Sequence, residues 1–383
     1  MSSQEYLNKM KVIQESILNF LEEGAKSEEN LIIFKDNYNN LKISDSKYDI
    51  LTLLHLISEI GNNCHRFPNF FDKIEKILQF FKEDIKKYFP NSKIFNIFKS
   101  NKRILLFLIE QQIIIIDEYI VKEITKTDKY INAKYPQYFQ PEIQPFINRL
   151  WLPRYLAEEL NEELPENFYE KRKEGENDNL ISEMIRKDMI AEFVAYVTRN
   201  EISLDAKIQP SIYETNSFLL EKQTESNQNQ SLTLIEYAAF FGSIKILKYL
   251  QYKDVKLTQS LLPLAIHSQN VQMIRFLEEN HVELEDKLYK QVFYESIKCH
   301  DNDIANYILS NFLQNDEENS RDVINQSLKY YNFAFLKNES ISKFPFRNLY
   351  KYEYYVLFYN FLNDMSQNAI FNILLIQSQL KII

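Results

Sequence analysis

Residues 233–250 of the chain read TLIEYAAFFGSIKILKYL. The small residues Ala238 and Ala239 allow a first helix to lie close against a neighbouring helix, and Gly242 supplies a turn with a positive φ at no steric cost. After this glycine, the apolar residues of 246–250 recur at the spacing of one helix face. The stretch therefore predicts two short helices joined by a tight turn.

The same pattern recurs twice further along the chain. Ala238 precedes Ala265 by 27 residues, and Ala265 precedes Ser296 by 31 residues. The apolar residues of the second helix stay in register, Met273 and Leu277 in one copy and Ile304 and Ile308 in the next. One such pair cannot bury its apolar face alone, so neighbouring pairs are expected to stack into a solenoid. The alternative is an unrelated helical array in which these small residues coincide by chance.

The spacing of threonine, alanines and glycine in 233–242 resembles the ankyrin repeat. The steps of 27 and 31 residues are shorter than the ankyrin period of about 33 residues, so short finger turns are expected. The predicted organisation is a helical N-terminal domain (1–131), a Pro-containing connector and acidic segment (132–179), ankyrin-like repeats (180–315, with clear copies near 233–256, 260–284 and 291–313) and a degraded C-terminal repeat (316–383).

Composition supports an all-α fold. The 383 residues include only 4 glycines, near 1%, where about 7% is usual. This scarcity excludes the glycine-rich phosphate-binding loops and disfavours two-residue hairpins, because both need backbone positions without a Cβ. Hydrophobic residues make up 45% of the chain, enough for an extended core. We therefore expect a soluble, helix-dominated protein: a helical N-terminal domain followed by a short ankyrin-like helix-turn-helix solenoid.

Cysteine content and hydropathy suggest where the chain resides. Two widely separated cysteines, Cys64 and Cys299, do not make a disulfide framework, and the N-terminus has no apolar core of a secretory signal. The most apolar stretch, residues 104–121, is interrupted by charged residues and by two glutamines, so a buried helix is expected there and no transmembrane segment. These features favour an intracellular location, with the cytoplasm as the simplest compartment.

A basic stretch, residues 73–103, has nine lysines and arginines against three acids, a local charge of +6. Such a stretch could bind an anionic partner, RNA or an acidic membrane surface. The favoured interpretation is an amphipathic helix with a lysine-rich solvated face, because the interleaved aromatic residues fall at helical spacing. Nucleic acid is therefore not the expected partner, and anion binding remains an alternative function.

The residues capable of catalysis or metal binding form no known motif. The pairs Cys64-His65 and Cys299-His300 suggest zinc ligands, but adjacent residues point in divergent directions and rarely share one metal. The five histidines form no H-E-x-x-H motif. No catalytic residue, metal ligand or cofactor is therefore expected. An uncharacterised enzyme in the N-terminal half, with His55 or His65 beside a carboxylate, remains an alternative.

The favoured function is that of a protein-protein interaction module, an adaptor or scaffold with no catalytic activity of its own. Stacked repeats of this kind bind an unknown protein partner with exposed positions of their first helices and with their finger turns. The predicted contact residues are Phe240, Phe241, His267, Ser268, Lys298 and Cys299 on the first helices, and Tyr252, Lys253, Asp254, Asn280 and His281 in the fingers. The alternative for Phe240 and Phe241 is burial beneath the 198–230 insertion.

Five strings make the chain resemble a family of protist ankyrin-repeat proteins, of the trichomonad type, that carry a domain of unknown function. The resemblance implies a helical N-terminal domain followed by ankyrin repeats, with no characterised activity. Similar proteins continue into regular ankyrin copies, whereas this chain stops after one degraded unit. The strings are LLHLISEIGNNCHRFPNFFDKIEKIL (53–78), IFNIFKSNKRILLFLIE (94–110), YPQYFQPEIQPFIN (135–148), LPENFYEKRKEGENDNLISEMIRKD (164–188) and IEYAAFFGS (235–243).

Overall fold

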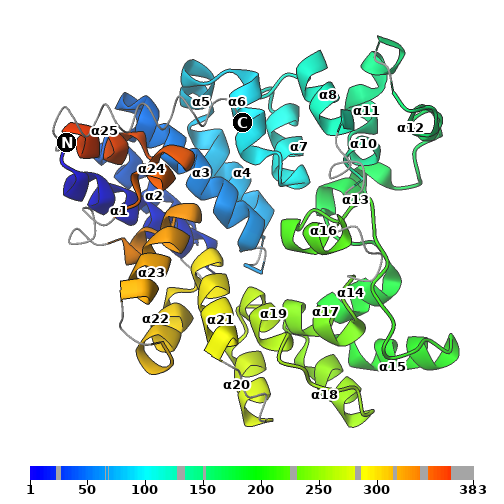
Figure 1. Ribbon diagram of the computed structural model, residues 1–383. Helices are drawn as coiled ribbons and strands as arrows, with labels where there is room; N and C mark the ends of the chain where they lie inside the picture. Colours follow the sequence, from blue (N-terminus) through cyan, green and yellow to red (C-terminus); the bar gives the residue numbers. More distant parts are fainter. Residues whose placement is uncertain are drawn as a thin grey trace. The chain divides into compact units, whose positions relative to one another are not determined.

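The structure is a computed structural model, and the described residues form helices joined by loops, with no strand among them (Figure 1). In that part of the chain the one β-type contact is an isolated antiparallel bridge between Lys207 and Thr233. The all-α prediction is therefore confirmed. The described residues are 1–22, 27–64, 66–67, 69–126, 134–149, 152–224, 231–280, 286–313, 317–336 and 344–363.

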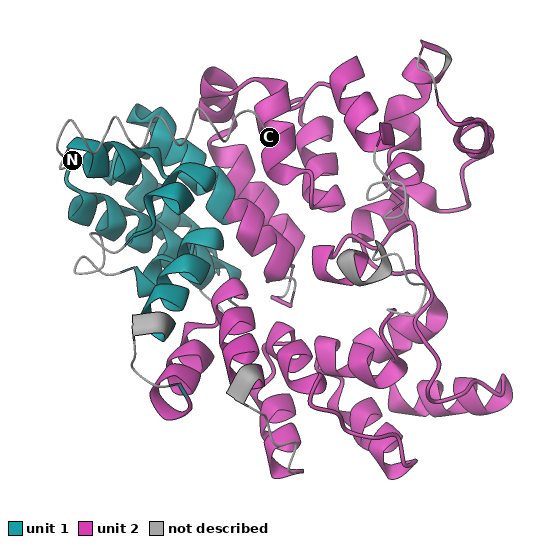
Figure 2. Ribbon diagram, in the orientation of Figure 1, with its two compact units in different colours: residues 1–56, 313–383 teal, residues 57–312 magenta. Residues whose placement is uncertain are grey.

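The chain forms two compact units (Figure 2). Unit 1 comprises residues 1–56 and 313–383, and unit 2 comprises residues 57–312. These bounds differ from the segments predicted from composition and repeats. The predicted division is based on amino-acid composition and repeats along the sequence, and it remains a prediction.

Unit 1 combines helices from both ends of the sequence. Its first helix, α1, starts with a capping box in which Ser2 Oγ accepts from the Glu5 amide and Glu5 Oε2 accepts from the Ser2 amide. The buried Gln14 joins the two ends, because its Oε1 accepts from the Phe333 amide at 2.7 Å and its Nε2 donates to Asn332 Oδ1. The elements are α1 (Ser3–Leu21), α2 (Ser27–Asn40), η1 (Ile43–Asp45), the first part of α3 (Lys47–Asn63), α23 (Glu317–Lys329), η3 (Phe333–Phe335), α24 (Phe346–Lys351) and α25 (Tyr355–Asn363).

The first half of unit 2 is a group of short helices around α7, whose residues 102–108 are all buried. One close approach explains Gly61 of α3: a Cβ there would lie 2.4 Å from Ile104 Cδ1. The elements after α3 are α4 (Phe70–Phe80), α5 (Lys82–Tyr88), α6 (Asn91–Phe98), α7 (Lys102–Glu110), α8 (Glu118–Lys126), α10 (Tyr135–Tyr138), α11 (Gln140–Ile143), η2 (Gln144–Arg149), α12 (Arg154–Glu159) and α13 (Phe168–Glu174).

Two local predictions for this half are wrong. Residues 104–121 form two helices instead of one, because Gln112 has φ 54° and the Asp117 carboxylate caps α8 by accepting from the Ile120 amide. The four prolines of 132–153 predict an irregular segment without helix, and this prediction is wrong as well. Pro136 and Pro141 lie in the first turns of α10 and α11, where the missing N–H has no partner to lose.

The second half of unit 2 consists of helix pairs, with α16 (Ser217–Thr224) inserted after the first pair. The first helices of successive pairs pack side by side, α14 against α17, α17 against α19, and α19 against α21. Each first helix also packs against the second helix of its own pair. The pairs are α14 (Leu180–Arg186) with α15 (Ile190–Arg199), α17 (Leu234–Phe241) with α18 (Ile244–Tyr252), α19 (Leu261–His267) with α20 (Val271–Glu279), and α21 (Asp286–Lys298) with α22 (Asn302–Asn311).

The turns inside these pairs share one backbone geometry. Each turn has one residue in the left-handed region: Asp188, Gly242, Gln269 and His300, with φ of 50°, 72°, 51° and 55°. Hydrogen bonds link neighbouring turns. Asp188 accepts from the Lys245 and Ile246 amides, and Asn270 Nδ2 donates to the Gly242 carbonyl at 3.0 Å. The positive φ predicted for Gly242 is confirmed.

Among the described residues, no helix combines the length and the apolarity needed to cross a membrane. Most apolar residues of 104–121 instead lie in the core, with Ile104, Leu105 and Leu108 each at most 1% exposed, whereas Ile115 is 65% exposed. The expectation that this stretch is not a transmembrane segment therefore agrees with the structure.

Candidate functional site

The residues predicted to line an exposed first-helix surface are mostly buried. Phe218 of α16 stacks on Phe240 with ring centroids 5.4 Å apart and lies 4.6 Å from the His267 ring. The insertion therefore covers the surface that the repeat pattern left open. The expected exposure is wrong, and for Phe240 the alternative of burial beneath the 198–230 insertion is confirmed. The exposed fractions are 1% for Phe240, 8% for Phe241, 2% for His267, 7% for Ser268 and 1% for Cys299, while Lys298 is half-buried.

The finger residues are exposed as predicted. Tyr252, at the end of α18, is 80% exposed, and Lys253, Asp254 and Asn280 are also exposed. Asn280 Oδ1 accepts from Gln251 Nε2 at 2.8 Å, which connects the ends of two successive second helices. His281 lies outside the described residues. The partner-binding role of these positions remains a prediction.

A groove of about 800 Å³ lies over three successive first helices. Glu236 of α17, Pro263 and Leu264 of α19, and Gln291 and Glu295 of α21 contribute to its lining. Glu236 aligns with Pro263, and Leu264 with Glu295, at the same steps of 27 and 31 residues as the repeat pattern. The groove therefore follows the sequence repeat, on first-helix positions that precede those predicted.

The lining of the groove is partly polar and partly apolar, and it has more acidic than basic groups. Phe218, Leu232 and Leu288 contribute apolar surface, and the charged lining residues are Lys207, Glu236 and Glu295. Glu236 belongs to the capping box of α17, where it accepts from the Thr233 amide at 2.9 Å. Gln291 is exposed, so a substitution there changes the groove without disturbing the core.

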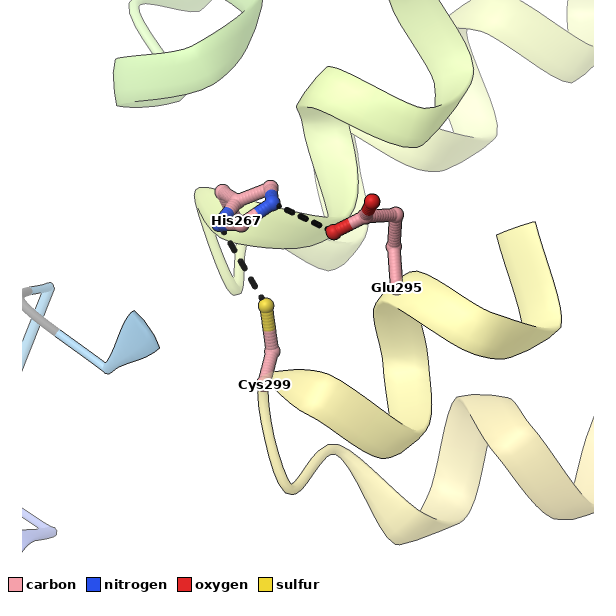
Figure 3. A group of neighbouring side chains, drawn as sticks. All are labelled: His267, Glu295 and Cys299. Carbon is pink, nitrogen blue, oxygen red and sulfur yellow. Dashed lines mark hydrogen bonds and ion pairs between the residues drawn. The ribbon is translucent and has the colours of Figure 1, made fainter. Parts of the chain in front are cut away.

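Beside the groove, His267, Glu295 and Cys299 form a buried polar cluster (Figure 3). His267 is the last residue of α19. Glu295 and Cys299 are four residues apart at the end of α21, a spacing that places both on one helix face. The imidazole lies between them, with Nε2 2.8 Å from Glu295 Oε2 and Nδ1 3.4 Å from Cys299 Sγ.

These contacts define the protonation of the cluster. Burial lowers the pKa of His267, which keeps the ring neutral near pH 7. Burial alone would raise the pKa of Glu295, but the hydrogen bond from His267 and the charge of Lys298, whose Nζ is 3.5 Å away, outweigh it and lower that pKa. The tautomer that fits carries its proton on Nε2, which donates to the carboxylate. Nδ1 then accepts from the Cys299 thiol.

In this cluster the thiol contacts the imidazole and the imidazole contacts the carboxylate, as a nucleophile, a base and an orienting carboxylate do in a catalytic triad. In this conformation the thiol cannot serve as a nucleophile, because Cys299 is 1% exposed and burial raises its pKa well above the ordinary value. Reactive cysteines need partial exposure and a lowered pKa. A thiol, an imidazole and a carboxylate are also the donors that zinc takes in proteins.

The sequence places His300 next to Cys299 but does not indicate the histidine that Cys299 Sγ meets in the fold. His300 lies in the turn after α21, whereas the partner of Cys299 is His267, 32 residues earlier. The repeat register could have found this pair, since it aligns His267-Ser268 with Lys298-Cys299 on adjacent first helices. The other cysteine, Cys64, is fully buried, and its Sγ donates to the Cys299 carbonyl at 3.2 Å.

A second polar cavity, of about 160 Å³, lies near Phe241. Arg66, Arg186, Glu176 and Glu214 are among its lining residues. Arg186 donates to Glu176 at 2.9 Å, while burial raises the pKa of Glu214 to about 7. The mixed charges of this cavity do not select one class of ligand.

The basic stretch 73–103 is less accessible than its composition suggests. Lys73, Lys102 and Arg103 are buried, and Arg103 pairs with Glu75 at 2.5 Å while donating to the Lys173 carbonyl. Lys102 lies fully buried with its Nζ 5.0 Å from the centre of the Tyr138 ring. At least three of the nine basic residues are therefore buried in the folded chain and are not available to bind an anion at the surface. Anion binding by this stretch remains a prediction.

No curated protein and no solved structure matches the chain. One family model does match, over residues 14–204: GldB_lipo, described as gliding motility protein GldB. The match ends before α17, so it includes neither the groove's first-helix residues nor the buried cluster.

This match overturns three expectations. The resemblance to a trichomonad-type protist ankyrin-repeat family is wrong, and so are the ankyrin-repeat and protist assignments, because the matching family is a different one. The intracellular, cytoplasmic location is corrected as well, because the label of the family denotes lipoproteins, which are membrane-associated. Over residues 14–204, the chain is similar to gliding motility protein GldB.

Proposed function

We propose that the chain is a protein-binding module without catalytic activity of its own, and that the groove over α17, α19 and α21 receives a segment of the partner. The observation that carries this proposal is the groove of about 800 Å³ that crosses three successive first helices. In the proposed architecture the helix pairs form a short helix-turn-helix solenoid that follows the helical N-terminal part. The proposed arrangement of the helix pairs is like that of ankyrin repeats. This statement concerns the arrangement of the helices and assigns the chain to no family.

The lining indicates the chemistry of the partner. Leu232, Leu264 and Leu288 offer apolar surface to an anchoring side chain, and the carboxylates of Glu236 and Glu295 outnumber the single lysine. A partner segment with an apolar anchor beside a lysine or arginine is complementary to this lining. The exposed finger residues, Tyr252 above all, are proposed as additional contacts at the edge of the solenoid.

Selection from a displayed library of random peptides tests the proposal. The immobilised protein should enrich peptides that combine an apolar residue with a neighbouring basic one. The same selection on the variant Gln291→Arg should not enrich them, because a guanidinium then occupies the groove. Gln272→Arg is the matched control, since Gln272 is an exposed glutamine on the second helix α20. Equal enrichment on all three proteins would contradict the proposal.

A second candidate, a role in gliding motility, is favoured by the family-model match over residues 14–204. Deleting the gene from its natural host and tracking single cells on a surface tests this role. Loss of gliding, restored by the wild-type gene, would support it. Unchanged gliding would argue against it and would leave the protein-binding proposal unaffected.

A further inference from the structure

The donor atoms of His267, Glu295 and Cys299 all lie within 4.8 Å of one another. The distance from Cys299 Sγ to His267 Nδ1 is 3.4 Å. A tetrahedral zinc ion with ordinary bond lengths to sulfur and nitrogen holds these two atoms roughly 3.5 Å apart. A cation can therefore replace the thiol proton between them with little movement of either side chain.

The scaffold holds the donors in place before any cation arrives. His267 is packed against the rings of Phe218 and Phe240, with centroids 4.6 and 5.1 Å away. Glu295 and Cys299 share one face of α21, as pairs four residues apart do in helical metal sites. Because the imidazole and the thiol are already ordered and buried, binding a cation costs little conformational entropy.

Glu295 connects the cluster to the groove. It is 17% exposed and lines the groove, whereas the other two donors are almost fully buried. It is therefore the member of the cluster that a cation meets first. In the present geometry its carboxylate holds the imidazole through Nε2, the arrangement that often supports a metal-binding histidine.

Charge also favours a cation here. Once Cys299 releases its proton on binding, the thiolate and the Glu295 carboxylate carry two negative charges against one positive charge on Lys298. We propose that Cys299 Sγ and His267 Nδ1 bind a thiophilic divalent cation while the Glu295 carboxylate holds the imidazole through Nε2, with zinc as the ion that these donors fit best. Glu295 belongs both to this site and to the lining of the groove, but cobalt binding is measured without any peptide, so each proposal can fail separately.

Cobalt(II) is the probe that tests the site, because a thiolate bound to cobalt produces a charge-transfer absorption that zinc abolishes by displacement. The chain has two cysteines, so such a band can arise only from Cys299 or Cys64. The reduced, chelator-treated full chain should develop the band on titration with cobalt and lose it on addition of zinc. Absence of the band in the folded wild-type protein would overturn the proposal.

Matched variants locate the site. Cys299→Ala should abolish the band, while Cys64→Ala, which removes the other buried thiol, should keep it. Glu295→Gln should weaken cobalt binding at least tenfold, since the carboxylate orients the imidazole through Nε2 and increases its basicity. Circular dichroism checks that each variant keeps its helix content. A band that survives in Cys299→Ala would refute the assignment.

Discussion

Phe240 shows how one insertion changes the role of a residue. Its ring stacks on Phe218 and on His267, and 1% of its surface is exposed. From the repeat pattern alone it belongs to an open surface. The pattern describes first-helix positions and contains no information about α16, which reaches this surface from outside the repeat. Burial of Phe240 is therefore a tertiary effect that the local sequence does not encode.

Because Phe240 is buried, replacing it should lower the free energy of unfolding. Phe240→Ala should lower the free energy of unfolding by about 3–5 kcal/mol, because it leaves a cavity among packed rings. Tyr252→Ala, which removes an exposed aromatic residue, should change it by no more than about 0.5 kcal/mol. Urea unfolding followed by circular dichroism measures both. Equal stability of Phe240→Ala and the wild type would show that the ring is not part of the core.

Glu214 should make stability depend on pH. Burial raises its pKa from the ordinary 4.5 to about 7, while Arg186 and Lys102 partly oppose this shift. Between these two pH values the folded carboxyl keeps its proton and the unfolded one has lost it. The contribution of Glu214 is therefore fully present below pH 4.5 and is lost as the pH rises towards 7, by on the order of 3 kcal/mol at most.

Glu214→Gln isolates this effect, because the amide does not titrate. The stability of the variant relative to the wild type should rise as the pH increases from 4.5 to 7. Thermal unfolding of both proteins across this range is the measurement. A constant difference at all pH values would show that the carboxyl titrates normally in the folded chain.

At the scale of elements, the turns inside the helix pairs show why only some of these pairs can be predicted from the sequence. Gly242 marks its turn because glycine adopts positive φ without strain. The equivalent residues Asp188, Gln269 and His300 adopt the same geometry without being glycine, so no sequence signal marks them. Hydrogen bonds between neighbouring turns, such as that from Asn270 to the Gly242 carbonyl, help to hold the shared geometry.

Two substitutions at equivalent turn positions should have opposite effects. Gly242→Ala should lower the free energy of unfolding by about 1–2 kcal/mol, because alanine disfavours φ 72° and its Cβ would lie 3.1 Å from the Cβ atoms of Ser268 and Asn270. Gln269→Gly should raise it by up to about 1 kcal/mol, because glycine relieves the strain at φ 51°. Denaturant unfolding compares the two, and effects of the same sign would contradict a common turn geometry.

At the scale of the whole chain, the spacing of residues predicts the features that depend on contacts between residues close together in the sequence. The all-α fold, the helix pair of 233–250 and the exposed fingers all follow from spacing within some thirty residues. Unit 1 does not, because Gln14 bonds to Phe333, 319 residues away, and no periodic pattern links such distant positions. The His267–Cys299 contact lies between these cases, since the repeat register brings the two helices together and only the fold shows which side chains meet.

The central claim, that the groove over α17, α19 and α21 binds a partner segment, is tested most directly by the affinity of one selected peptide for three proteins. A fluorescent copy of the most enriched peptide would be titrated with the wild type, Gln291→Arg and Gln272→Arg. Groove binding predicts at least tenfold weaker binding to Gln291→Arg, a loss of about 1.4 kcal/mol, and unchanged binding to Gln272→Arg. Equal affinity for all three proteins would contradict the claim.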